Sequence, residues 1–270
     1  TGTNDNPVVN TAGSITQSED DLEAGITVDA LTSNLLGDAT DIDDPDHTLQ
    51  IAAVNGSPAG DTVAVTLNFT DADGAPQTQN VDLTVQADGS YQIAAFDLDA
   101  LPQGQDAIAT FTYSVIDQNG GTSAPVNAQI TITGTNDNPV VNTAGSITQS
   151  EDDLEAGINI DALNSNLLGD ASDIDDPNNT LLIASVNGSP AGMAVAVDLH
   201  FTDADGAPQT QLVDLTVQPD GSYQIAAFDL DALPQGQDAT ATFTYSVSDQ
   251  HGGTSAPVNA QITITGTNDN

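Results

Sequence analysis

The sequence predicts an all-β protein built from two tandem antiparallel β-sandwich domains, and three observations lead to that prediction. The chain matches itself without gaps at a shift of 132 residues, so it contains two copies of one unit. Apolar and polar residues alternate with a period of two through most of each copy. Turn-forming sequences rich in Asp, Asn and Gly separate these alternating runs at short intervals.

The alternating runs define about seven expected strands per copy and their buried faces. In the first copy Val63, Val65, Leu67 and Phe69 share one face, and further runs lie at 81–85, 91–93, 111–115 and 126–132. Of the 132 aligned positions 17 differ between the copies, and positions 66, 68, 80 and 116 are among those assigned to the solvent face. Segments 29–36 and 97–101 look helical at most briefly. Five aromatic residues per copy are expected to anchor one core.

The repeat also sets the expected domain boundaries. Residues 1–6 end a preceding linker, 7–133 form the first sandwich, 134–138 form a linker, 139–265 form the second sandwich, and 266–270 begin another linker. The hexapeptide Thr-Gly-Thr-Asn-Asp-Asn stands at both ends of the sequence. We therefore expect the chain to be a segment of a longer array of such units.

The charge of the chain is extreme. It has no Lys, Arg or Cys, and its 40 acidic residues give a formal net charge of −40. The carboxylates cannot form Lys or Arg salt bridges, so bound metal is their strongest available partner, and self-repulsion opposes compaction until something binds. Nucleic acid and anionic membrane surfaces are excluded as partners because both attract Lys and Arg. The absence of a long apolar run predicts no direct membrane insertion.

The residue inventory argues against an enzyme. The three histidines, His47, His200 and His251, occupy positions that are not equivalent in the two copies. Without Cys or Lys, thiol nucleophiles and Schiff bases are excluded. Paired carboxylates can cleave glycosides in principle, but the chain has no Trp to stack on a sugar. We expect no enzymatic activity.

Several short motifs carry a family resemblance that covers nearly all of each copy. The stretch 35–44, continued by Thr48-Leu49, resembles the cadherin-like repeats of bacterial surface proteins. The stretches 88–91 (Asp-Gly-Ser-Tyr) and 111–115 (Phe-Thr-Tyr-Ser-Val) resemble the VCBS repeats of large secreted adhesins. The stretch 130–139 is similar to the closing motif of both. One departure is Asp44-Pro45-Asp46, where relatives often carry Asp-Gly-Asp, so the geometry of this loop stays open.

The resemblance implies an immunoglobulin-like or cadherin-like sandwich in the extender region of a type I secreted (RTX) adhesin. Such a region lies outside the cell, at the cell surface, and serves adhesion and biofilm formation. Its repeats are spacers that project a ligand-binding region, with calcium stiffening the junctions. The expected partners are neighbouring repeats in the same chain, which would be monomeric and extended. The alternative is a module that itself binds a sugar or protein ligand.

Calcium takes six to eight oxygen ligands, which short loops rich in Asp and Asn supply. The linker offers Asn136, Asp137 and Asn138, and Pro139 restricts the backbone that follows. The resemblance implies ions shared between neighbouring domains at this linker. The preceding domain would offer Glu19, Asp20 and Asp117, and the following domain Asp173, Asp175 and Asp176. The equivalents in the second copy are Glu151, Asp152 and Asp249. A polar linker without metal is the alternative.

The loop at 41–46 (Asp-Ile-Asp-Asp-Pro-Asp) places four carboxylates in six residues. Such a loop is self-repelling without a cation, although a solvated acidic loop remains the alternative. We expect Asp41, Asp43 and Asp44 to be the ligands, because Asp46 is replaced by Asn178 in the second copy. Other acidic pairs are ambiguous. Tight turns explain Asp71, Asp73 and Asp88, and capping explains Asp97 and Asp99 as well as metal does.

Overall fold

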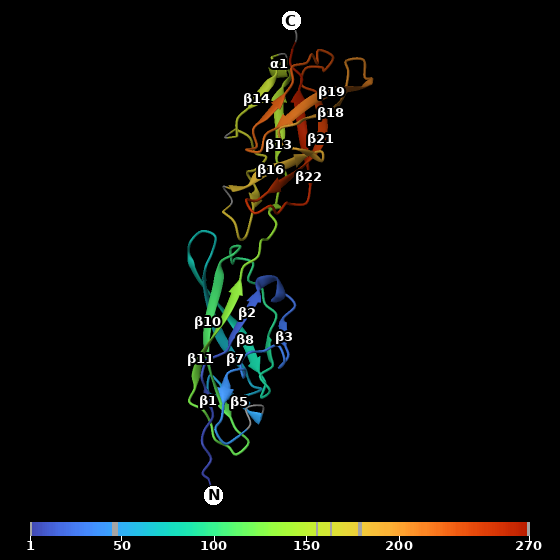
Figure 1. Cartoon of the computed structure of the whole chain (residues 1–270). Coiled ribbons are helices and arrows are strands. Elements are labelled where there is room, and N and C mark those ends of the chain that lie inside the picture. Colours follow the sequence, from blue (N-terminus) through green and yellow to red (C-terminus); the bar gives the residue numbers. More distant parts are fainter. Residues whose placement is uncertain (1, 45–47, 155, 163, 178–179, 269–270) are drawn as a thin grey trace. The chain divides into compact units, whose positions relative to one another are not determined.

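The structure is a computed structural model that describes residues 2–44, 48–154, 156–162, 164–177 and 180–268. The chain divides into two compact units, Thr1–Asn136 and Asp137–Asn270. Each unit consists almost entirely of strands (Figure 1). The prediction of an all-β protein with two tandem β-sandwich domains is confirmed.

The strands of the two domains correspond one to one. In the first domain they are β1 (Val8–Val9), β2 (Ser14–Ser18), β3 (Ile26–Val28), β4 (Ala39–Thr40), β5 (Gln50–Val54), β6 (Ser57–Pro58), β7 (Thr62–Thr70), β8 (Pro76–Val85), β9 (Tyr91–Ile93), β10 (Asp106–Ile116) and β11 (Val126–Thr133). In the second they are β12 (Val140–Val141), β13 (Ser146–Ser150), β14 (Ile158–Ile160), β15 (Ala171–Ser172), β16 (Leu182–Val186), β17 (Ser189–Pro190), β18 (Ala194–Thr202), β19 (Pro208–Val217), β20 (Tyr223–Ile225), β21 (Asp238–Ser248) and β22 (Val258–Thr265).

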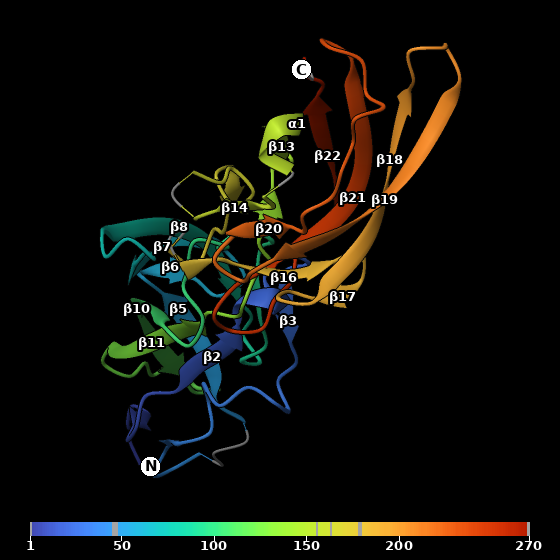
Figure 2. The ribbon, with the colours of Figure 1, turned by 90° about the horizontal axis from the view of Figure 1, so that it is seen from above.

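Each sandwich is organised around one long strand, β10 in the first domain and β21 in the second, which pairs with three other strands. The main path in the first domain is β2-β11-β10-β7-β8-β9-β3. Strand β10 contacts β7 through Ile108 and Asn68, and farther along it pairs with β5. The second domain repeats this order, and Figure 2 shows β18 and β19 as a long hairpin beside β21. One pairing differs from the expected antiparallel scheme, because β2 runs parallel to β11 and β13 runs parallel to β22.

The core follows the predicted alternation. In β7, Val63, Val65 and Leu67 are buried, while the residues between them are exposed. Phe111 and Tyr113 are at most 2% exposed, and Phe69 and Phe96 pack against the core while remaining partly exposed. Positions 66, 68 and 80 are exposed in both domains and position 116 is half-buried in both, so substitutions between the copies are tolerated there. The assignment of faces from the sequence is confirmed.

The short helices form at places that the sequence did not indicate. A 3-10 turn spans Glu19–Asp21, and its counterpart α1 spans Glu151–Leu154. Segments 29–36 and 97–101 contain turns instead of helices. Their acidic side chains accept bonds from nearby N–H groups, Asp29 Oδ1 from Leu31 at 3.1 Å and Asp97 Oδ1 from Asp99 at 3.0 Å, and such local bonds compete with a helix. Among the described residues no helix is long and apolar enough to cross a bilayer.

Strand register places acidic residues at two opposite ends of each sandwich. Ser18 and Asp106 both pair with Thr133, so Glu19 lies at the end where β10 begins. Asp117 follows the other end of β10, after Ile116. Ten residues of extended strand span about 33 Å. The two groups of candidate ligands therefore cannot share one ion within a domain.

Candidate metal centre

The Asp-Ile-Asp-Asp loop closes on its first carboxylate. Asp173 Oδ1 accepts the backbone N–H groups of Asp175 at 3.2 Å and Asp176 at 3.0 Å. The first domain has the same turn, in which Asp41 Oδ1 accepts the N–H groups of Asp43 at 3.0 Å and Asp44 at 3.1 Å. This local turn sends the intervening isoleucine outward and turns the last Asp of the loop inward. Asp44 is 8% exposed and its counterpart Asp176 is 3% exposed.

A second carboxylate comes from the turn that follows β10 or β21. Asp117 Oδ1 accepts the N–H groups of Asn119 and Gly121, each at 2.8 Å. Asp249 Oδ1 accepts three N–H groups in the second domain, from His251, Gly252 and Gly253, at 2.6–2.9 Å. In each domain, one carboxylate oxygen of this Asp thus accepts the hydrogen bonds that close the turn. Burial raises the pKa of Asp117, but the donors around it outweigh that effect and lower the pKa below its usual value.

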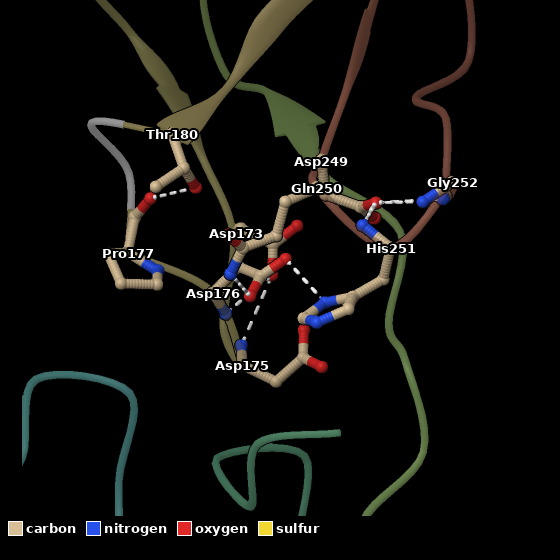
Figure 3. A network of polar contacts seen from close by, with 10 residues as sticks. Asp173, Asp175, Asp176, Pro177, Thr180, Asp249, Gln250, His251 and Gly252 are labelled. Atoms are coloured by element: carbon tan, nitrogen blue, oxygen red, sulfur yellow. Dashed lines mark hydrogen bonds and ion pairs between the residues drawn. The ribbon is translucent and has the colours of Figure 1, made fainter. Parts of the chain in front are cut away.

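These two loops meet in the second domain. Asp173, Asp176 and Asp249 each place one carboxylate oxygen within 4.8 Å of the others (Figure 3). Oxygens bound to one calcium ion at about 2.3–2.6 Å lie no more than about 5.2 Å apart, so one ion can bind all three. The equivalent Asp41, Asp44 and Asp117 do not reach this spacing among the described residues. We call Asp173, Asp175, Asp176 and Asp249 the second-domain acidic centre, and Asp41, Asp43, Asp44 and Asp117 the first-domain acidic centre.

Asp175 gives an independent sign that the second-domain acidic centre needs a cation. This residue is 1% exposed, and neither carboxylate oxygen has a well-formed hydrogen bond to the described part of the chain. Burial and the adjoining carboxyl group of Asp173 raise the pKa of Asp175 to about 8, and the approaching backbone N–H of Asp137 opposes this only in part. At neutral pH this carboxyl group therefore carries a proton unless a cation replaces it. The residues present fit calcium, which prefers oxygen ligands.

The Asn-Asp-Asn segment lies against the domain that follows it. Asn4 Nδ2 donates to Asp117 Oδ2 at 2.9 Å, and Asp5 N–H donates to Asp43 Oδ2 at 3.1 Å. A Cβ atom on Gly121 would overlap Asp117 Oδ2, and it would lie 2.7 Å from Asn4 Nδ2 and 2.8 Å from Asn6 Oδ1. Only glycine leaves room for these polar groups at this position.

The second copy of the segment, 136–138, shows the same preference for the following domain. Asn138 Oδ1 accepts the N–H of Thr254 at 3.0 Å, and the backbone of Asp137 approaches Asp175. The expected grouping of Asp117 with Glu19 and Asp20 is therefore wrong. The structure pairs Asp117 with the segment that precedes its own domain, and Asp249 takes the corresponding place beside residues 136–138.

The opposite end of each domain has its own acidic group. Glu19 Oε2 accepts the N–H of Thr135 at 2.9 Å, and Asp20 Oδ1 accepts the hydroxyl of Thr135 at 2.7 Å. Glu19 and Asp99 place carboxylate oxygens within 4.8 Å of each other. Burial, and then the carboxyl group of Asp97, raise the pKa of Asp99. The sequence signal for this contact was the placement of Asp97 and Asp99 two residues apart, which is also the spacing of Asp41 and Asp43.

The second domain repeats this arrangement at its own far end. Glu151 Oε2 accepts the N–H of Thr267 at 2.8 Å, and Asp152 Oδ1 accepts the Thr267 hydroxyl at 2.6 Å. Glu151 is 5% exposed, and its Oε1 has no hydrogen bond to the residues that the structure describes. A buried carboxylate oxygen without such a hydrogen bond is suited to bind a cation.

The remaining acidic turns have structural partners. Asp71 Oδ1 accepts the N–H of Ala75 at 2.8 Å, and its Oδ2 accepts the Gln77 side chain at 2.6 Å. Asp88 Oδ1 accepts both the N–H and the hydroxyl of Ser90. These bonds, led by the side-chain donor in each case, lower the pKa of both groups. The turn interpretation accounts for both. Asp46 and His47 lie outside the described residues.

Comparisons with known proteins add little to this geometry. No family model and no curated protein matches the chain. Solved structures similar to it include protocadherin gamma B2 extracellular cadherin domains 3–6, at 12% identity and a TM-score of 0.42, covering 98% of this chain and 52% of that one. Domains 1–5 of the same protocadherin show 15% identity, a TM-score of 0.40, and coverage of 97% and 41%. An endo-fucoidan hydrolase of glycoside hydrolase family 107 shows 14% identity, a TM-score of 0.26, and coverage of 97% and 28%. The chain spans about half or less of these proteins.

Proposed function

We propose that the chain is a pair of calcium-stabilised spacer repeats from a large bacterial cell-surface adhesin of the RTX type. The observation that carries the proposal is the convergence of Asp173, Asp176 and Asp249 in a protein without any Lys or Arg. The repeats would lie outside the cell and hold a ligand-binding region away from its surface, in adhesion and biofilm formation. Neighbouring repeats of the same chain would be their partners.

Chain connectivity supports a role for calcium at the junction. Asn136 ends the first unit and Asp137 begins the second, without an intervening segment. The segment 136–138 therefore connects an acidic group at the end of one domain, Glu19 with Asp99, to the acidic centre of the next. Ions bound by this segment would add several oxygen ligands to the short connection between the domains.

The surface of each domain favours the role of a spacer over the role of a ligand-binding module. The large apolar side chains exposed in the described residues are aliphatic or Met, and none is aromatic. Binding sites for sugars and proteins are commonly rich in aromatic residues. The two domains also carry nearly identical loops, which suits a part whose task is length.

We expect Asp137→Ala to loosen the junction in calcium, because it removes a carboxylate from the connecting segment. Small-angle scattering should give a broader distance distribution than for the wild-type chain, while the melting of each domain changes little. The matched control is Asp5→Ala, which alters the same motif outside the segment that connects these two domains. If Asp137→Ala in calcium scattered like wild type, the connection would be a polar linker and the spacer mechanism would fail.

A further inference from the structure

Two side chains beside each acidic centre contact the same buried carboxylate. Gln250 Nε2 donates to Asp176 Oδ1 at 2.7 Å, and His251 Nδ1 lies 2.9 Å from Asp176 Oδ2 (Figure 3). In the first domain Gln118 Nε2 donates to Asp44 Oδ1 at 2.5 Å, and Asn119 Nδ2 donates to Asp44 Oδ2 at 2.9 Å. Both oxygens of the carboxylate thus have a donor in each domain. We call these two pairs of donors the carboxylate clamps.

The clamp side chains are not needed to form the turn that carries them. The turn after β21 closes through backbone N–H groups that donate to Asp249 Oδ1. The side chains of Gln250 and His251 instead reach a residue 74 or 75 positions away in the sequence. The first domain preserves both contacts although it has Asn119 in place of histidine. The shared feature is a donor nitrogen at the same oxygen.

The clamp leaves the carboxylate able to bind an ion. A carboxylate oxygen has two lone pairs, so an oxygen that accepts one hydrogen bond can still coordinate a metal. The amide donors carry no charge, and therefore they orient the carboxylate without replacing the cation as Lys or Arg would. Asp176 and Asp44 are both less than 9% exposed, so solvent contributes little to their orientation.

We infer that Gln250 and His251 are positioning residues that hold Asp176 in the orientation for calcium. This inference rests on the calcium centre proposed above. Outer partners of metal ligands fix ligand orientation, and their loss typically reduces affinity by about 10- to 100-fold. The first domain places equivalent donors on Asp44, although among the described residues Asp41, Asp44 and Asp117 do not reach the spacing of the second-domain acidic centre.

The test is a calcium titration of the full chain followed by nuclear magnetic resonance. The amides of Gly253 and Gly121 donate to Asp249 and Asp117, so each reports on one centre. Gln250→Ala should raise the calcium Kd at Gly253 by about 10- to 100-fold and leave the Kd at Gly121 unchanged. Gln118→Ala is the matched control and should leave the calcium Kd at Gly253 unchanged. His251→Ala should weaken binding, whereas His251→Asn, which restores the donor found in the first domain, should keep it within a few-fold of wild type.

The outcomes separate this inference from the proposed function. If Gly253 of the wild-type chain does not respond to calcium, the calcium centre fails and the clamp fails with it. If wild type binds calcium and Gln250→Ala binds it equally well, only the clamp is wrong. Melting in chelator gives a further check. If Gln250→Ala lowers the melting temperature there as much as in calcium, the contact serves the fold and not the metal.

Discussion

In millimolar calcium the chain is expected to unfold about 10 °C above its transition in chelator. An ion at a hundredfold excess over its Kd adds about 2.7 kcal/mol to the free energy of unfolding, and each kcal/mol moves the transition of a domain of this size by about 4 °C. The physical reason is the net charge of −40 with no cationic side chain, combined with buried carboxylates that repel one another without a cation. Differential scanning calorimetry measures the shift.

The control for this shift is ionic strength. Sodium chloride added to the chelator sample screens exposed charges but cannot occupy a site built from several oxygens. The calcium-dependent gain should therefore persist when ionic strength is matched. An identical transition in chelator and in calcium would contradict metal binding to the folded domains.

Asp249→Asn is expected to have opposite effects on stability with and without calcium. The amide keeps an oxygen for the N–H groups of the turn, and it replaces the second oxygen with a donor that faces Asp173 and Asp176. In chelator this removes repulsion, so the second domain should melt a few degrees higher. In calcium it removes a ligand, and the calcium affinity should fall by more than the loss of an outer contact costs, which is about 10- to 100-fold.

Asp198→Asn is the matched control for that variant. Asp198 is exposed on β18, where the first domain has Thr66, so its substitution removes the same charge away from the acidic centre. It should change neither calcium affinity nor the transition in chelator appreciably. If Asp249→Asn lowered stability in chelator, repulsion among these carboxylates would not be the dominant cost in the metal-free domain.

Local patterns in the sequence were enough to predict the strands and their buried faces. A half-buried strand requires apolar and polar residues to alternate, and Val63, Val65 and Leu67 show this alternation directly. The parallel pairing of β2 with β11 could not be predicted in this way, because it depends on contacts between Ser14 and Gln129, more than 100 residues apart. Very short strands such as β1 also lack enough residues to show a period.

The acidic centres were predicted in part for a similar reason. The candidate ligands Asp41, Asp43 and Asp44 are close together in the sequence, so this cluster of carboxylates was visible. Which end of the sandwich Asp117 occupies depends on the register of β10, and the sequence does not contain that register. The clamp residues, such as Gln118, left no sign in the sequence, because an amide beside an Asp in a turn is common and its contact lies 74 positions away.

The central claim is that these centres are built for calcium, and a calorimetric titration in a background of magnesium tests it most directly. Magnesium prefers six ligands at about 2.0–2.1 Å and releases water reluctantly, whereas calcium accepts more ligands at about 2.3–2.6 Å. The carboxylate oxygens of Asp173, Asp176 and Asp249 lie within 4.8 Å of one another, which is close enough for one calcium ion to bind all three. We predict saturable calcium binding with a defined stoichiometry that excess magnesium does not abolish. Equal affinity for the two ions would mean diffuse screening of charge and would contradict the account.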